Sequence, residues 1–435
     1  MMQHPRDPSA IDQLSRRRFL SAAASGAVAG GLWSSRQTFA QQAEPETGGK
    51  PRRLKRIAAI NSVYRIRSHA YHIAGRFVHG YRREGFHHQP PFKLARMFND
   101  QYPAGDMSRD LCRKYDIELA DTVAGALGDN GGLDVDGVLL IVEHGDYPEN
   151  QFGQKLYPRF ELFQQIVEVF RKNGRAVPVF NDKHLSYDHR QAAQMVAWSR
   201  ELKFPFMAGS SLPVTWRRPD LEPPLGTPLT EGLACYGGSL EHYFFHALEA
   251  LQCMLERRQG GETGVKTVEC LEGDAVWKAG DAGRWSWKLL DAALARSPSC
   301  NYGDVRDNVA TPYAILIEYR DGTRGCVLNL SEHISDFNFA GAIRGREQPV
   351  STCFYLPAPP GAKYFDALTY NIERMFATGK PSYPVERTLL TSTVLDLAMH
   401  SLAEGGKPHH SDALDIRYTA PHDSGYFRGR YTEAG

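Results

Sequence analysis

The fold is decided by the stretch AVPVFNDKHLS, residues 176–186, in which an apolar run is followed by polar side chains. The apolar part suits a short buried strand, and the polar part suits the turn after it. Farther along the chain, residues 188–202 predict a helix and residues 204–209 a second strand. A strand, a turn, a helix and a strand in this order predict a βαβ unit with parallel strands.

The same alternation continues toward the N-terminus. Apolar runs predict strands at residues 56–62, 93–98 and 136–142, of which the last is the strongest. Helices are predicted at residues 68–81, 108–115 and 157–173. We therefore expect a Rossmann-like domain, with helices packed on a parallel sheet. Open sheets of this kind bind ligands at the carboxyl ends of their strands.

The pattern changes after Pro219. Strands are predicted at residues 311–319 and 324–330, joined by Asp321-Gly322, which is a hairpin signal. Helices are predicted at residues 239–258, 367–378 and 389–403. This half predicts an α+β domain with a mostly antiparallel sheet, and the sheet is a candidate surface for homo-oligomer formation.

The N-terminus resembles an export signal. The basic motif SRRRFL at residues 15–20 precedes an apolar run at 21–33, and Thr38-Phe39-Ala40 follows. These are the three parts of a signal peptide, and the paired arginines indicate the twin-arginine type. The alternative is a basic tail that precedes alanines. The apolar run is shorter than the roughly 20 residues of a membrane span.

We therefore expect a periplasmic or secreted protein with no stable membrane anchor after cleavage, and the twin-arginine translocase as a partner during export. The predicted organisation is a signal peptide (1–42), a linker (43–54), a Rossmann-like nucleotide-binding domain (55–215) and an α+β domain for substrate or assembly (216–435).

Composition narrows the class of partner. The 435 residues are 42% hydrophobic and 23% charged, with a net charge of +1, which is typical of a soluble globular protein. A nearly neutral surface has no field to hold a polyanion, so nucleic acid is not expected to bind. The seven cysteines are scattered and have no zinc-finger spacing.

Polar side chains follow two of the predicted strands. Glu143 and His144 come after the strand at 136–142, and Asn181 to His184 after the strand at 176–180. Because parallel strands end at one edge of the sheet, we expect these groups to face the ligand. The first predicted helix adds the candidates His69, His72 and His79; solvated helix histidines are the alternative.

A pair of histidines lies on the helix at 239–258. His242 and His246 are one turn apart and share a face of the helix, and Glu249 follows one turn later. Such a set can bind a divalent metal. The alternative is a pair of ordinary helix histidines that bind solvent or backbone.

Three motifs together resemble the Gfo/Idh/MocA oxidoreductase family. Lys183 follows a strand, between Asp182 and His184, at the place of the family's active-site lysine. Gly237-Gly238 precedes His242 and His246, and His246 fits the catalytic histidine, while His242 stands where the family has aspartate. Residues 364–408 have the order and spacing of the last helices. The resemblance implies NAD or NADP as cofactor, with Lys183 as base or proton relay.

One departure from the family concerns the cofactor. The first strand runs into INSVYRIRSH, residues 60–69, which has no glycine where the family has a glycine-rich phosphate turn. Arg65 or Arg67 could instead pair with a phosphate, and Asp100 could hold a ribose hydroxyl. The full set of predicted cofactor contacts is Asn61, Arg65, Asp100, Glu143, His144 and Asp182.

Three hypotheses follow. The first is an exported oxidoreductase that acts on a sugar or cyclitol hydroxyl with tightly bound NAD(P). The second is a dinucleotide-free lyase, isomerase or hydrolase of carbohydrate derivatives on the same fold, with a metal at His242, His246 and Glu249 as an option. The third is a non-catalytic sugar-binding protein. In all three the partner is a small carbohydrate or cyclitol.

Overall fold

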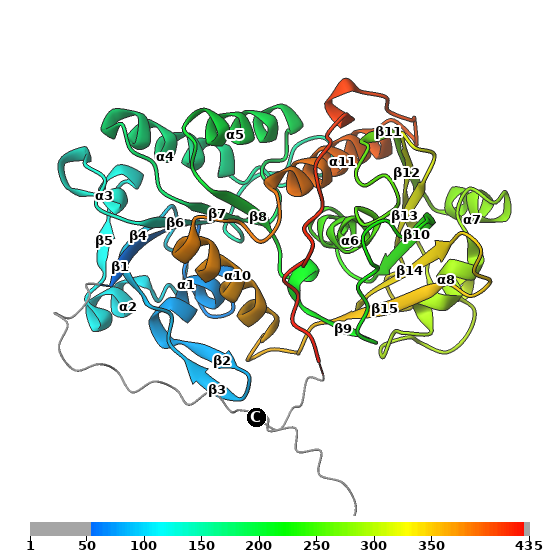
Figure 1. The fold of residues 1–435 in the computed structure, drawn as a ribbon, viewed down its shortest axis with the longest axis horizontal. Coiled ribbons are helices and arrows are strands. Elements are labelled where there is room, and N and C mark those ends of the chain that lie inside the picture. The colour runs from blue at the N-terminus through cyan, green and yellow to red at the C-terminus, as the bar shows by residue number, and fades with distance from the viewer. Residues whose placement is uncertain (1–53, 430–435) are drawn as a thin grey trace, which may run out of the picture. The chain divides into compact units, whose positions relative to one another are not determined.

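A computed structural model describes residues 54–429. Its first half is a sheet of six strands, all parallel to their neighbours, in the order β5-β4-β1-β6-β7-β8 (Figure 1). The strands are β1 (Lys55–Asn61), β4 (Phe92–Asn99), β5 (Glu118–Ala120), β6 (Gly137–Ile141), β7 (Val179–Asp182) and β8 (Phe206–Gly209). The predicted Rossmann-like sheet is confirmed. Its topological switch point lies between β1 and β6, where open sheets bind ligands.

Helices cover both faces of this sheet. One face packs against α3 (Val123–Leu127), α4 (Arg159–Asn173) and α5 (His189–Glu201). The other packs against α1 (His69–His79), α2 (Ser108–Tyr115) and the distant α10 (Tyr364–Thr378). All five residues of β6 are therefore buried, which explains why this strand is a continuous apolar run rather than an alternating one.

The second sheet has seven strands in the order β11-β12-β13-β10-β14-β15-β9. Only β10 and β13 pair in parallel, so the predicted mostly antiparallel sheet is also confirmed. The strands are β9 (Trp216–Arg218), β10 (Leu229–Tyr236), β11 (Val265–Glu272), β12 (Tyr313–Tyr319), β13 (Arg324–Asn329), β14 (Phe337–Ile343) and β15 (Val350–Tyr355). Asp321-Gly322 lies between β12 and β13, as the hairpin signal predicts.

This sheet is also covered on both faces. The long helices α6 (Leu240–Leu255) and α11 (Val385–Ala403) pack on one face, and α7 (Asp274–Asp281) and α8 (Trp287–Leu294) on the other. The sequence predictions do not include five strands of this sheet, β9, β10, β11, β14 and β15, nor β5 and α3 of the first half. They also do not include α7, α8, α9 (Val305–Asn308) and the small hairpin of β2 (Tyr81–Arg83) and β3 (Phe86–His88).

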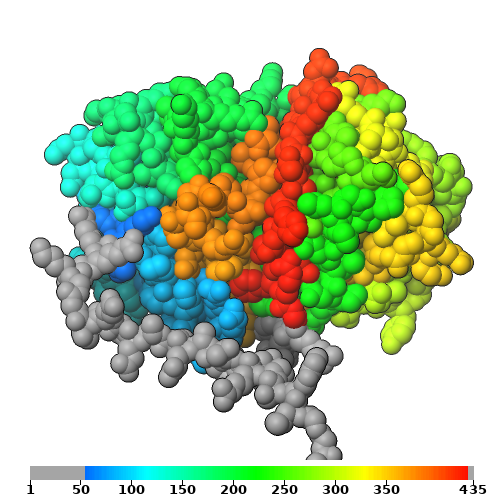
Figure 2. Space-filling view, in the orientation of Figure 1, coloured from blue at the N-terminus to red at the C-terminus, as the bar shows by residue number. Residues whose placement is uncertain are grey.

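The C-terminal helices connect the two sheets. Helix α11 packs on α5 and β8 of the first sheet and on α6 and β11 of the second. It is buried around nearly its whole circumference, and its buried charged residues Arg387 and Asp396 hydrogen-bond to other parts of the chain. The chain after α11 then runs over the surface as an extended segment, residues 404–429 (Figure 2). Because α10 and α11 also pack on the first sheet, residues beyond 216 complete its core as well as the core of the second sheet.

The predicted signal peptide and nearly all of the predicted linker lie outside the described residues. Within residues 54–429, no helix combines the length and apolarity needed to cross a membrane.

Candidate active site

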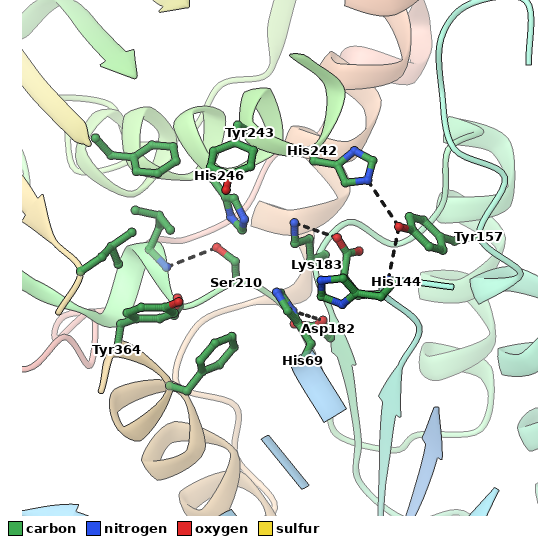
Figure 3. A pocket seen from close by; sticks show the side chains of 16 residues that line it. His69, His144, Tyr157, Asp182, Lys183, Ser210, His242, Tyr243, His246 and Tyr364 are labelled. Atoms are coloured by element: carbon green, nitrogen blue, oxygen red, sulfur yellow. Dashed lines mark hydrogen bonds and ion pairs between the residues drawn. The ribbon is translucent and has the colours of Figure 1, made fainter. Parts of the chain in front are cut away.

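A cavity of about 220 Å³ lies where the carboxyl ends of β6, β7 and β8 face the start of α6 (Figure 3). It is lined by polar and aromatic side chains and by two leucines: His69, Glu143, His144, Tyr157, Asp182, Lys183, Ser210, Ser211, Leu212, His242, Tyr243, His246, Phe337, Leu356, Tyr364 and Phe365. The structure therefore brings together six of the predicted site residues: Glu143, His144, Asp182, Lys183, His242 and His246.

Lys183 is held in this cavity by its backbone and by an ion pair. Its φ of 66° is unusual for a lysine, and its N–H donates to the carbonyl of Gly209 at 3.0 Å. The side chain of Asn181 donates to the carbonyl oxygens of Asp182 and His184, which fixes the turn. The Lys183 ammonium lies 3.0 Å from a carboxylate oxygen of Glu143.

Glu143 is buried between two cations. Its second carboxylate oxygen accepts a hydrogen bond of 2.6 Å from Arg159, which is fully buried and also donates to His184. Burial raises the pKa of Glu143, but Lys183 and Arg159 outweigh this and hold the pKa well below its usual range. Glu143 is thus an anion that positions Lys183.

A second acid–base pair lies beside the first. Nδ1 of His69, the first residue of α1, is 2.6 Å from a carboxylate oxygen of Asp182, the last residue of β7. Asp182 is completely buried. Ser68 caps α1 and thereby sets the direction from which His69 enters the cavity. A carboxylate on Nδ1 leaves Nε2 of the ring free to accept a proton.

The sequence predicts His69 only as one of several helix histidines and Asp182 as a cofactor contact, and it does not predict that the two side chains pair. The available signal was the position of His69 at a helix start that follows a strand end.

Two other histidines of the cavity, His144 and His246, are held neutral by burial. Burial, and then the nearby His69, lowers the pKa of His144 to about 4. Burial, and then Lys183, lowers the pKa of His246 well below its usual value. His242 lies 2.8 Å from a carboxylate oxygen of Glu241 and 3.4 Å from the Tyr157 hydroxyl. Neutral histidines offer hydrogen-bond donors and acceptors to an uncharged, hydroxyl-rich ligand.

Four predicted residues do not line the cavity. Asn61 is buried in β1 and donates to Asn99 at 3.1 Å. Arg65 lies in the turn after β1, where its backbone forms an isolated antiparallel β-bridge with Asp106. The Asp100 carboxylate accepts a hydrogen bond of 2.7 Å from Tyr147. Glu249 lies behind Ser210, whose N–H and hydroxyl both donate to it.

The geometry does not support the metal hypothesis at His242, His246 and Glu249. Among residues 54–429, the one His/Cys/Asp/Glu group with all ligand atoms within 4.8 Å of one another is Asp188, His189 and Asp396. Burial raises the pKa of Glu249 to about 7, which disfavours the charged form that a metal requires.

The turn after β1 does not fit a dinucleotide pyrophosphate. Glycine-rich turns bind it with free backbone N–H groups and with space left by absent side chains. Here Val63 and Tyr64 fill the turn and are buried. The N–H of Ser62 donates to Ile141 at 3.2 Å, and that of Arg65 to the Ser68 hydroxyl at 3.2 Å. Both donors are therefore used within the protein.

The lowered histidine pKa values predict acid sensitivity. His72 and His144 both have a pKa of about 4, in each case mainly through burial. Between pH 6.5 and 4 the unfolded chain takes up these protons and the folded chain does not. Stability should therefore fall over that range, by about 1.4 kcal/mol per histidine for each unit of pKa difference.

Urea unfolding at pH 7, 5.5 and 4.5 measures this fall. The double substitution His72→Gln and His144→Gln should flatten it, while His410→Gln, an exposed control, should leave it unchanged. An equal slope in all three proteins would contradict the assignment.

Comparison with known proteins shows the fold but no close relative. No family model and no curated protein matches the chain. The solved structure of GenD2 from gentamicin A biosynthesis, in complex with NAD, has a TM-score of 0.51 and 13% identity, covering 82% of this chain and 96% of that one. Myo-inositol dehydrogenase from Lactobacillus casei, in complex with NAD(H) and myo-inositol, has a TM-score of 0.50 and 10% identity, covering 82% and 97%. The chain therefore has the two-domain fold of these dehydrogenase-type structures.

Proposed function

We propose that the protein is a Gfo/Idh/MocA-type enzyme that transfers a proton to or from a small sugar or cyclitol. The observation that carries the proposal is the presence of two acid–base pairs, His69–Asp182 and Lys183–Glu143, in one cavity. The shared fold supports the substrate class, because one protein of that fold was solved in complex with myo-inositol. A catalytic role is favoured over binding alone, because buried charges cost free energy that neutral polar groups would not.

The two pairs have different roles in the proposed proton transfer. Nε2 of His69 accepts a proton from the substrate, and the Asp182 carboxylate holds the ring and stabilises the imidazolium that forms. The Lys183 ammonium donates a hydrogen bond or a proton to the oxygen where negative charge develops. Glu143 and the buried Arg159 keep the ammonium in place.

Two reactions share this proton step. Oxidation of a hydroxyl, the first hypothesis from the sequence, also passes a hydride to NAD(P). A redox-neutral isomerisation or elimination, the second hypothesis, needs no such acceptor. The filled turn after β1 favours the second.

Replacement of Lys183 with methionine should weaken carbohydrate binding by about 10- to 100-fold, because the variant loses a charge-assisted hydrogen bond to a ligand oxygen. Isothermal titration calorimetry with myo-inositol and 2-keto-myo-inositol measures the affinities. The matched control is Lys266→Met, whose ammonium makes an exposed ion pair with Glu318 outside the cavity. Failure of the unmodified protein to bind either probe, or equal affinities of the two variants, would refute the proposal.

A further inference from the structure

We infer that this site works without a bound dinucleotide, on a sugar or cyclitol that already carries a carbonyl group. The inference rests on the proposed function and specifies its reaction class. It rests on two features of the structure, the hydrogen-bonded loops at the topological switch point and the position of His69. It also rests on the reactions that a histidine base can catalyse.

The turn after β1 is tied to the end of β6. The Ser62 N–H donates to Ile141 at 3.2 Å, which continues the β1–β6 ladder by one residue. The Ser62 hydroxyl donates to the carbonyl oxygen of Glu143, in the loop after β6, at 2.8 Å. In a dinucleotide-binding sheet the pyrophosphate lies at this switch point and accepts hydrogen bonds from free N–H groups of a glycine-rich turn. Here the Ser62 side chain spans from the turn to the loop after β6, and its N–H is already used.

The loop after β4 closes the adjoining side, where the adenosine half would lie. The Asp100 N–H donates to Asn61 at 2.9 Å, at the end of the β1–β4 ladder. The N–H groups of Gln101 and Met107 continue this pairing into the turn after β1, to Ser62 at 2.8 Å and to Tyr64 at 2.9 Å. The loop is thereby held along the turn by backbone hydrogen bonds.

Side chains tie the same loop to the loop after β6. The Gln101 amide donates to the carbonyl of Asp146 at 3.0 Å and accepts from its N–H at 2.9 Å. The Tyr147 hydroxyl donates to Asp100 at 2.7 Å. Asp100, the residue at the ribose-binding position of this fold, is therefore engaged by the protein itself. The turn after β1 and the loops after β4 and β6 therefore form one hydrogen-bonded layer at the carboxyl edge of the sheet.

The cavity that remains is small and has His69 in its wall. His69 is bonded to Asp182 and lies edge-on to His144 and Phe365, with ring centroids 5.3 and 5.1 Å away. The volume of about 220 Å³ is below the roughly 300–1,000 Å³ of ordinary small-molecule sites. It suits a single sugar ring, and Asp100 is not among the residues that line it.

The reaction must then be redox-neutral, and this limits the substrate. A histidine cannot remove a proton from an unactivated carbon, but it can do so next to a carbonyl. His69 takes that proton, the C–H electron pair forms a carbon–carbon double bond, and the carbonyl oxygen becomes an oxyanion that Lys183 stabilises or protonates. The enolate then re-forms the carbonyl in one of two ways: it regains the proton at carbon from the His69 imidazolium, or it expels a leaving group from the next carbon, and that group takes the proton from His69.

The reaction that supplies this substrate must therefore be the oxidation of a ring hydroxyl to a ketone by a separate oxidoreductase. The present protein would consume the keto product.

Two measurements on the purified full chain test the inference. Mass spectrometry before and after denaturation should detect no NAD or NADP, and added NADH should show no saturable fluorescence change. Proton NMR in D2O should show the protein exchanging the hydrogens next to the carbonyl of 2-keto-myo-inositol, and leaving myo-inositol unchanged.

The outcomes separate the inference from the proposed function. Exchange without a dinucleotide supports both. Stoichiometric NAD(P), or saturable NADH binding, overturns the inference while carbohydrate binding keeps the proposed function. Binding of the keto probe without exchange also overturns the inference. No binding of either carbohydrate overturns the proposed function.

Discussion

Replacement of Asp182 with asparagine is expected to slow proton exchange on 2-keto-myo-inositol by about 10²- to 10⁴-fold, the usual contribution of a positioned general base. The Asp182 carboxylate accepts from Nδ1 of His69. An amide in its place can present its NH₂ group to Nδ1, which would move the ring proton to Nε2 and block proton acceptance. Direct removal of the base by His69→Ala should produce a loss of similar size.

A matched control is available elsewhere in the chain. Asp396 and His189 form another buried carboxylate–histidine pair, at 2.7 Å, that does not line the cavity. Asp396→Asn should leave the exchange rate within a few-fold of the unmodified protein. The dependence of kcat/KM on pH gives a second readout. Loss of the base should remove the limb of this profile that reports its protonation, whereas a purely structural defect should leave the shape of the profile unchanged. Equal rates in Asp182→Asn and Asp396→Asn would disprove the assignment of the base.

Replacement of Arg387 with alanine is expected to lower the free energy of unfolding by about 3–5 kcal/mol. Arg387 on α11 pairs with Glu256, next to the end of α6, and both side chains are fully buried. The substitution leaves the Glu256 carboxylate without its cation in the interior. Because α11 packs on both sheets, the loss should affect the whole described unit rather than one element.

Urea unfolding followed by circular dichroism measures this effect. Arg190→Ala is the control, because Arg190 pairs with Asp188 at 2.7 Å with its own side chain 81% exposed. Exposed pairs contribute at most about 1 kcal/mol. A loss of 1 kcal/mol or less in Arg387→Ala would show that the buried pair is not required for stability.

Much of the first sheet could be predicted because its signals are local. Within the predicted strand at 136–142, residues 137–142 have no polar side chain because helices cover both faces of the strand, and that pattern is visible in the chain. Lys183 could be placed at the active edge by the same logic, because a polar residue directly after a buried parallel strand must emerge at the carboxyl end of the sheet.

The sequence raises the question whether a dinucleotide binds, but it cannot answer that question. The missing glycine after β1 was visible, but its consequence depended on the path of the loop after β4. Gln101 and Asp146 are 45 residues apart, and nothing in their local sequence indicates that they pair.

By itself, the sequence determined the main strands and helices of the first half, the fold class of both halves, and the placement of Lys183, Glu143 and His144 at one edge. It did not predict five of the seven strands of the second sheet, β9, β10, β11, β14 and β15. Only the tertiary structure decided that His69 pairs with Asp182, 113 residues away, and that the turn after β1 and the loops after β4 and β6 form one hydrogen-bonded layer. The reason is physical: periodicity records which side of an element is buried, whereas a hydrogen bond between distant side chains depends on loop paths and rotamers that are set only when the elements pack.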